Sequence, residues 1–279
     1  MIKILMHKDD EVAKLKVDSD NILEEVIEIY NEDLLPEKTN NPYQSLHKWL
    51  MLRKMSLRRD DLSPIREFYG SKIFVSDNSR SLFDCYWLKN KKSECWDSIN
   101  AFKNWIYYND DIFLMLFQPE DYDGPDDEMI NDSPNLTISG TEKRLWYKDK
   151  DGVTGLIDSD VREQTQMYKK AVENGISIVA ERKPIILCKH LFTFIPQKTT
   201  EDIESIPFDH LYNTTFDINL SKEANLQKCC ETYNIPKWMD FFDELMEFDK
   251  ILEKNDRELM DIRVLRDSNT LKILGFDTL

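Results

Sequence analysis

Residues 248–267 read FDKILEKNDRELMDIRVLRD, and their apolar spacing predicts the end of an amphipathic helix, a polar loop and a short apolar strand. Asp256 and Arg257 lie in the predicted loop, and Asp261 follows five residues after Asp256. An Asp that orients an attacking hydroxyl, followed five residues later by a side chain that faces a metal ion, is typical of a phosphoryl-transfer catalytic loop. Acidic residues are common in the loops of this chain, so this spacing alone is weak evidence for a catalytic loop. The segments upstream of it have to support the same interpretation.

The balance of charges excludes some classes of partner. The chain has 279 residues, with 37 Lys and Arg against 53 Asp and Glu, which gives a net charge of −16. A charge of this sign repels nucleic-acid backbones and anionic membrane surfaces, so we expect neither as a direct partner. Mimicry of a nucleic acid is one use for such acidity, although a charge spread over the whole chain does not single it out. Hydrophobic residues make up 41% of the chain, which is enough for a core.

The cysteines and the N-terminus indicate a cytoplasmic protein. Five Cys, an odd number, occur at positions that fit neither a disulfide framework nor a zinc site: Cys85, Cys95, Cys188, Cys229 and Cys230. We expect them to be buried thiols in a reducing compartment. The apolar residues 1–6 are too few for a signal peptide, and no apolar run reaches membrane-spanning length.

The N-terminal part mixes strand and helix patterns. Two alternating segments around a charged turn predict a β-hairpin over residues 2–7 and 11–17. Helical spacing of apolar residues predicts helices at 21–30, 43–55 and 61–69, and a further short amphipathic piece at 96–106. Alternation predicts a strand at 79–89. Residues 1–120 are therefore predicted to form a small N-terminal α/β domain.

A break in composition follows. Residues 121–132 are acidic, contain a Gly-Pro pair and have little apolar content, so they are predicted to be a linker. They lack the ordered spacing of a calcium loop, which favours a solvated loop. After the break, patterns predict strands at 136–148, 153–157, 176–180, 183–187 and 191–195, and helices at 159–174, 219–232 and 237–253. The predicted fold class is α+β, with a β-rich lobe and the start of a helical lobe in residues 133–279.

Four segments in this order resemble the HipA-type serine/threonine kinases found in Firmicutes and their mobile elements. They are SRSLFDCYWL at 79–88, SPNLTISGTEKRLW at 133–146, the pair NGIS at 174–177 and CKHLFT at 188–193, and DKILEKNDRELMDIRVLRDSNTLKILG at 249–275. The last segment is the most specific of the four. The resemblance implies a kinase-like fold for residues 133–279.

The resemblance also implies roles for particular residues. Asp256, with Arg257 beside it, would orient the hydroxyl that receives the phosphoryl group. Asp261 and Asp277 would hold magnesium, and the loop formed by Ser139, Gly140, Thr141 and Lys143 would cover the phosphates of ATP. Residue types alone leave a plainer alternative open, in which Asp256 caps the end of a helix and residues 139–143 form an ordinary β-turn.

Several positions depart from the family pattern. Asp158 occupies the place of the Lys that anchors ATP, which reverses the charge there. Glu258 replaces a His, and Arg263 replaces a small Gly. The sequence ends at Leu279, before the rest of the family's helical lobe, so we expect a truncated and degenerate member of the family.

These departures favour a function in protein binding over catalysis. The first hypothesis is a pseudokinase-like regulator or inhibitor that acts mainly by binding a protein. The alternative is an active serine/threonine protein kinase of toxin–antitoxin type that uses ATP and magnesium, and a more distant one is an acidic nucleic-acid mimic. The apolar face of the predicted helix at 237–253 would need cover, so a homodimer is also considered.

Overall fold

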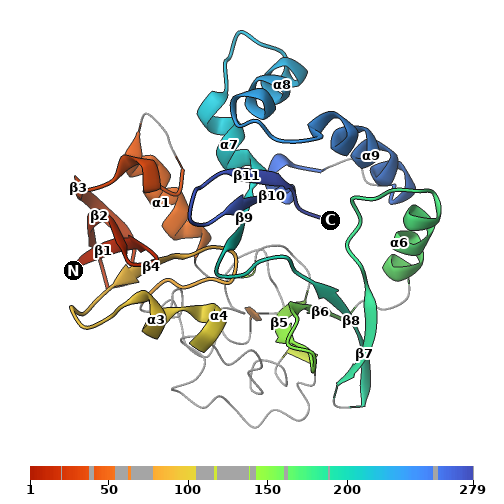
Figure 1. The fold of residues 1–279 in the computed structure, drawn as a ribbon, viewed down its shortest axis with the longest axis horizontal. Coiled ribbons are helices and arrows are strands. Elements are labelled where there is room, and N and C mark those ends of the chain that lie inside the picture. The colour runs from red at the N-terminus through yellow and green to blue at the C-terminus, as the bar shows by residue number, and fades with distance from the viewer. Residues whose placement is uncertain are drawn as a thin grey trace. The chain divides into compact units, whose positions relative to one another are not determined.

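The structure, a computed structural model, divides into two compact units, Met1–Ile157 and Asp158–Leu279 (Figure 1). It describes residues 1–19, 21–37, 41–53, 62–63, 78–104, 116–117, 138, 143–159, 163–187, 189–253 and 257–278. The predicted linker at 121–132 lies outside these residues, as does most of the predicted helix at 61–69. The described elements combine helices with antiparallel sheets, which confirms the α+β class. Among them, no helix has both the length and the apolar character needed to cross a bilayer.

An antiparallel sheet opens the first unit, and its described strands follow the order β3-β2-β1-β4. The predicted N-terminal hairpin is confirmed, because β1 (Ile2–His7) pairs with β2 (Asp10–Val17) along its whole length. Lys8 takes the positive φ, 51°, that a tight hairpin turn requires. On the other side of β1 lies β4 (Tyr86–Lys89), so the strand predicted at 79–89 is confirmed only at its end.

The helix predicted at 21–30 is wrong, because this segment forms β3 (Leu23–Ile29), the strand beside β2. The register between these strands shifts twice, so β3 carries an extra residue at two points. Each bulge moves the next core-facing residue three positions ahead rather than two. Leu23, Val26 and Ile29 consequently all pack into one core. The helix is predicted from apolar residues at helical spacing, Ile22, Leu23, Val26, Ile27 and Tyr30, and the extra residues of β3 allow part of that spacing, from Leu23 to Val26, in a strand.

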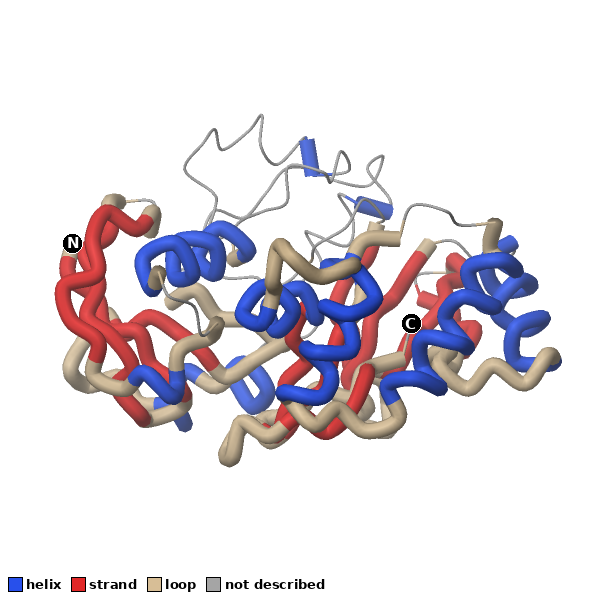
Figure 2. Tube along the Cα trace, turned by 90° about the horizontal axis from the view of Figure 1, so that it is seen from above, coloured by secondary structure: helices blue, strands red, loops and turns tan. Residues whose placement is uncertain are grey.

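A helix packs on this sheet and completes its core. α1 (Pro42–Leu52) confirms the helix predicted at 43–55 over its described part, and a short 3-10 turn, η1 (Glu32–Leu34), precedes it. Asn41 caps α1 by accepting the backbone N–H of Gln44 at 3.2 Å. The buried side chains of the helix join the core of the sheet: Leu46, Trp49 and Leu50. Figure 2 shows this helix beside the red strands near the N-terminus.

Two smaller cores lie among the other described residues of the first unit. The amphipathic piece predicted at 96–106 forms two short helices, α3 (Trp96–Ile99) and α4 (Ala101–Asn104), in the residues described. The strands predicted on either side of residues 149–152 form in the structure as β5 (Arg144–Lys148) and β6 (Thr154–Asp158). One core contains Met6, Cys85, Trp87 and Trp96. The other joins α4 to β5 and β6 through Leu82, Ala101, Ile138, Trp146 and Leu156.

The second unit begins with α6 (Glu163–Glu173), the helix predicted at 159–174. Gly175 ends it with φ 82°, and the N–H of Ile176 returns to the carbonyl oxygen of Ala171 at 3.1 Å. The strand predicted at 176–180 is wrong. The N–H groups of Ser177 and Ile178 donate to the carboxylate of Glu244 and not to a strand.

The remaining described elements of the second unit are a β-hairpin, a sheet and helices. β7 (Lys183–Leu187) and β8 (His190–Pro196) form the predicted antiparallel hairpin. β9 (Ile203–Pro207), β10 (Arg263–Asp267) and β11 (Ile273–Phe276) form a sheet in the order β11-β10-β9. The helices are α7 (Phe208–Thr215), α8 (Lys222–Thr232) and α9 (Trp238–Ile251). The sequence predicts α8, α9 and β10, but it does not predict β9, α7 or β11.

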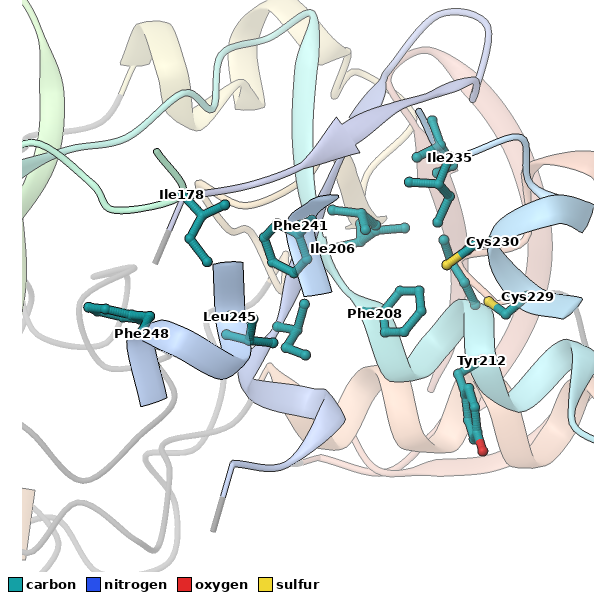
Figure 3. Close-up of a cluster of buried hydrophobic side chains, with 14 of the residues drawn as sticks. Ile178, Ile206, Phe208, Tyr212, Cys229, Cys230, Ile235, Phe241, Leu245 and Phe248 are labelled. Carbon is teal, nitrogen blue, oxygen red and sulfur yellow. The ribbon is translucent and has the colours of Figure 1, made fainter. Parts of the chain in front are cut away.

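The main core of the second unit lies between that sheet and its helices (Figure 3). Phe241 of α9 stacks on Phe276 of β11, with ring centroids 4.0 Å apart and planes 9° apart. Leu245 and Phe248 of α9 belong to the same cluster. The apolar face of α9 is thus covered by its own chain, so it gives no support to self-association through that face.

The cysteines only partly match the prediction of buried thiols. Cys85, Cys229 and Cys230 are free and buried, as predicted, and Figure 3 shows the last two within the core. Cys95 is exposed, which contradicts the prediction, because it lies at the N-terminal cap of α3. Cys188 lies outside the described residues.

Candidate functional site

Arg257 of the predicted catalytic loop is bound to α9. Its Nε donates to both carboxylate oxygens of Asp249, at 2.8 and 2.9 Å, and its Nη2 donates to Oδ1 at 2.5 Å. The two side chains are 12% and 18% exposed, so this bidentate pair is largely shielded from water. The guanidinium carbon also lies 5.9 Å from the ring centroid of Phe248. These contacts hold Arg257 against the last turns of α9. Asp256 itself lies outside the described residues.

Asp261, the first predicted magnesium ligand, stabilises a short 3-10 turn, η7 (Leu259–Asp261). Its Oδ2 accepts the N–H of Glu258 at 3.1 Å, and its own N–H donates to the carbonyl oxygen of Glu258 at 3.0 Å. This exchange between the two residues is a local turn interaction of the kind that short acidic side chains make. Asp261 is nevertheless exposed, so its carboxylate stays accessible to a cation.

Asp277, the second predicted magnesium ligand, is buried just after β11 in a polar network. The hydroxyl of Ser205 donates to its Oδ2 at 2.9 Å, and the N–H of Thr278 donates to its Oδ1 at 2.8 Å. The Nζ of Lys198 lies 3.9 Å from Oδ1. Arg263, which stands where the resemblance expects a Gly, donates from Nε to the hydroxyl of Ser205 at 2.9 Å. Protein donors therefore already face both carboxylate oxygens of Asp277.

The predicted phosphate loop is described only at Lys143, since Ser139, Gly140 and Thr141 lie outside the described residues. The Nζ of Lys143 donates to the carbonyl oxygen of Leu116 at 3.2 Å. Asp158, at the place of the ATP-anchoring Lys, is buried at the end of β6. In the described part of the chain, no three His, Cys, Asp or Glu side chains are grouped so that they could hold a metal ion.

A buried residue of α8 organises a loop that the sequence does not single out. The α7–α8 loop (residues 216–221) joins these two helices. Asn225 is 1% exposed, and its Nδ2 donates to the carbonyl oxygens of Asp217, Leu220 and Ser221 at 2.9, 3.3 and 3.1 Å. Its Oδ1 accepts the N–H of Asp217 at 2.8 Å. The two N–H donors of this amide are shared among three carbonyl oxygens, and its oxygen accepts from a fourth backbone group, so one side chain holds the path of the loop.

Asp217 also stabilises the loop, through hydrogen bonds within the loop itself. Its Oδ1 accepts the N–H of Asn219 at 3.0 Å and the side-chain Nδ2 of Asn219 at 3.1 Å. Its Oδ2 lies 3.7 Å from the Nζ of Lys228 on α8. The hydrogen bonds from Asn219, and after them the charge of Lys228, lower the pKa of Asp217 below its ordinary value.

The α7–α8 loop carries large apolar side chains that are exposed to solvent. Ile218 is 86% exposed, Phe216 is 52% exposed, and Leu220 is also exposed. Phe216 lies beside Tyr212 of α7, with ring centroids 5.7 Å apart. Since the backbone is tied to Asn225, the loop cannot simply turn these side chains inward. The alternation of apolar and polar residues at 216–220 is the sequence signal that marks them.

No protein-family model, curated protein or solved structure matches this chain. The kinase roles suggested for Asp256, Asp261 and Asp277 therefore depend on the resemblance of short motifs. The geometry of the α7–α8 loop does not depend on that resemblance.

Proposed function

We propose that this protein acts by binding another protein through the α7–α8 loop, as a pseudokinase-like regulator or inhibitor would. The observation that carries the proposal is the position of Ile218, which is 86% exposed on a backbone that Asn225 fixes. Single exposed apolar residues are normal on protein surfaces. Here Phe216, Ile218 and Leu220 come together within one short loop, which favours a contact surface.

The bracing of the loop adds to this argument. Ordering side chains on association costs about 0.5–1.5 kcal/mol for each flexible side chain that is immobilised, and ordering a loop adds to that cost. A loop whose path is already fixed in the free protein avoids much of this cost. The hydrogen bonds of Asn225 and Asp217 therefore make the α7–α8 loop suited to binding.

The positions of the kinase-like residues support binding over phosphoryl transfer. A magnesium ligand presents free carboxylate lone pairs to the ion. Each oxygen of Asp277 already accepts one protein hydrogen bond inside the core, which leaves fewer lone pairs for an ion, and the guanidinium of Arg257 is bound by Asp249. Asp158 is buried where the resemblance expects the ATP-anchoring Lys, so this position supplies no cation for the phosphates of ATP.

A photo-crosslinker beside the loop tests the proposal. We would place p-benzoylphenylalanine at Lys222, an exposed position next to the loop, and at Lys183 on β7 as a control. In cells that express the protein, we expect a crosslinked protein from position 222 and not from position 183. Adding Ile218→Asp should abolish that product, whereas Ile186→Asp, at another highly exposed Ile, should not.

The partner identified in this way allows a quantitative test with purified proteins. We expect Ile218→Asp to weaken the complex roughly thirtyfold or more, because losing an interface hot spot costs at least about 2 kcal/mol. Equal affinities for wild type and Ile218→Asp would show that the α7–α8 loop is not the binding surface.

A further inference from the structure

The outer face of α9 combines exposed methionines with carboxylates that have no partner. Met239 and Met246 are 62% and 58% exposed. Asp240, Asp243 and Glu247 are exposed as well, and no hydrogen bond or ion pair reaches them from the described residues. At about 100° per residue, these five side chains fall within roughly a third of the helix circumference. We call them the α9 outer face.

The other acidic residues of α9 are already used inside the unit. Glu244 accepts hydrogen bonds from the hydroxyl and the backbone N–H of Ser177, and Asp249 binds Arg257. The remaining three carboxylates, those of the outer face, thus stay free for an external cation. Lys250 is the single basic residue of the helix, and it follows at the C-terminal end.

The inner side of α9 holds the outer face in place. Phe241, Leu245 and Phe248 are buried in the main core of the unit. The ion pair of Asp249 with Arg257 and the contact of Glu244 with Ser177 add polar anchors on the sides of the helix. A partner that binds the outer face therefore meets an ordered surface and loses little free energy in ordering it.

We propose that the α9 outer face binds a cationic amphipathic helical segment of a partner protein. Lys and Arg side chains of such a segment complement the carboxylates of Asp240, Asp243 and Glu247. Its apolar side chains pack on Met239 and Met246, because the flexible thioether adapts to different shapes and Met is enriched at protein interfaces.

Charge argues against the other occupants of this face. A second copy of this chain, meeting it face to face, would bring the same three carboxylates into contact with each other. Nucleic acids and anionic membranes carry the same sign of charge as the face and are repelled. The proposal adds a class of partner to the proposed protein binding and uses a different surface, so the two proposals can fail separately.

Synthetic helical peptides test the proposal on the full chain. One peptide carries Leu on one face and Lys on the other, and its counterpart has Glu in place of each Lys. By titration calorimetry we expect the Lys peptide to bind, with affinity that falls as salt is raised, and the Glu peptide not to bind. Failure of the Lys peptide to bind, or equal binding of both peptides, would overturn the proposal.

Matched variants locate the binding surface. Asp240→Asn, Asp243→Asn and Glu247→Gln together should weaken binding of the Lys peptide about tenfold, as three partly exposed ion pairs are lost. The control combines Glu11→Gln, Glu25→Gln and Glu28→Gln, which change the net charge equally at exposed positions of β2 and β3 and should leave binding unchanged. Equal weakening by both triple variants would mean that the net charge alone attracts the peptide and would refute the site.

Two further variants distinguish the contribution of packing from that of charge, and binding at the α9 outer face from binding at the α7–α8 loop. Met239→Ala with Met246→Ala should weaken binding severalfold and leave its salt dependence unchanged, because the carboxylates remain. Ile218→Asp, in the α7–α8 loop, should leave peptide binding unchanged. Loss of peptide binding in Ile218→Asp would contradict the assignment to α9, whereas a failed peptide experiment with intact crosslinking at residue 222 would leave the proposed function standing.

Discussion

Glu204 and Arg266 face each other across β9 and β10 as a buried ion pair. They are direct partners in the antiparallel register, and Nε and Nη2 of Arg266 lie 2.8 and 2.6 Å from Oε2 of Glu204. The Glu204 side chain is fully buried and the Arg266 side chain nearly so. Desolvation offsets much of the attraction in such a pair, yet each partner helps to neutralise the other in the core.

We therefore predict that removing Arg266 alone is far more harmful than removing the pair. Arg266→Leu should lower the free energy of unfolding by about 3–5 kcal/mol, because it removes the cation that binds a fully buried carboxylate through two short contacts. Glu204→Met combined with Arg266→Leu should cost much less. Urea unfolding of the three proteins checks this, and a double variant as unstable as the single one would contradict it.

The bracing role of Asn225 predicts a large effect from a nearly isosteric change. Asn225→Asp keeps the oxygen that accepts from Asp217 but replaces the donor that serves three carbonyl oxygens. A carboxylate facing carbonyl oxygens should destabilise the second unit by about 2–4 kcal/mol. Gln227→Glu, at an exposed position of the same helix, is the control; it removes an exposed hydrogen bond to Glu231 and should cost no more than about 0.5 kcal/mol. Thermal unfolding and hydrogen exchange of the loop amides measure both effects.

The lowered pKa of Asp217 gives a prediction about pH. A carboxylate whose pKa is lower in the folded state contributes stability above its unfolded pKa and loses it as pH falls through the folded value. The α7–α8 loop should therefore loosen only at pH values below the ordinary Asp pKa of 3.8. Asn219→Ala removes the side-chain hydrogen bond to Asp217 but keeps the larger contribution from the backbone N–H, so carboxyl NMR should find the pKa of Asp217 moved only part of the way toward its ordinary value. An unchanged pKa would show that the side chain of Asn219 contributes nothing to the shift.

The thiols should differ sharply in reactivity. Burial raises the pKa of Cys229 to about 11 and that of Cys230 to about 12, whereas Cys95 is exposed. Because the thiolate is the reactive form, iodoacetamide at neutral pH should label Cys95 quickly and leave Cys229 and Cys230 unlabelled until unfolding. Peptide mapping by mass spectrometry resolves each site. Early labelling of Cys229 would show that the core around α8 opens in the native state.

ATP turnover separates the two leading hypotheses. With radiolabelled ATP and magnesium, we expect no labelled product above the background of Asp256→Ala, because protein donors already bind Asp277 and position 158 supplies no cation for the phosphates. Robust labelling that disappears in Asp256→Ala would establish an active kinase and refute the pseudokinase-like reading. Calorimetric titration with magnesium and ATP shows whether nucleotide binds without turnover.

The sequence predicts elements best where one apolar face is regular. Phe241, Leu245 and Phe248 recur at helical spacing, so α9 is evident without the structure. β9 is missed because Glu204 and Ser205 interrupt its apolar pattern, and the partners that make them tolerable in a core, Arg266 and Asp277, lie more than sixty residues further along. Pairing at that range is not visible in a local pattern.

The same limit applies to the candidate sites. The motif around Asp256 suggests a catalytic Arg, but the role of Arg257 depends on Asp249, which only the folded chain places against it. Asn225 looks like a surface residue of a polar helix, and its burial follows from the turn of the chain before α8. The sequence groups Met246 with the apolar side chains of α9, and only the structure shows that Met246 is 58% exposed.

The bulged strand β3 also bears on how the protein stays in solution. Among the described strands it lies at an edge of its sheet, where unpaired backbone groups can recruit strands from other molecules. Its two register shifts interrupt the regular ladder that an incoming strand would need, and Glu24, Glu25 and Glu28 place negative charge along it. The two extra residues that make the apolar spacing of β3 resemble a helix in the sequence thus also protect the folded protein against aggregation.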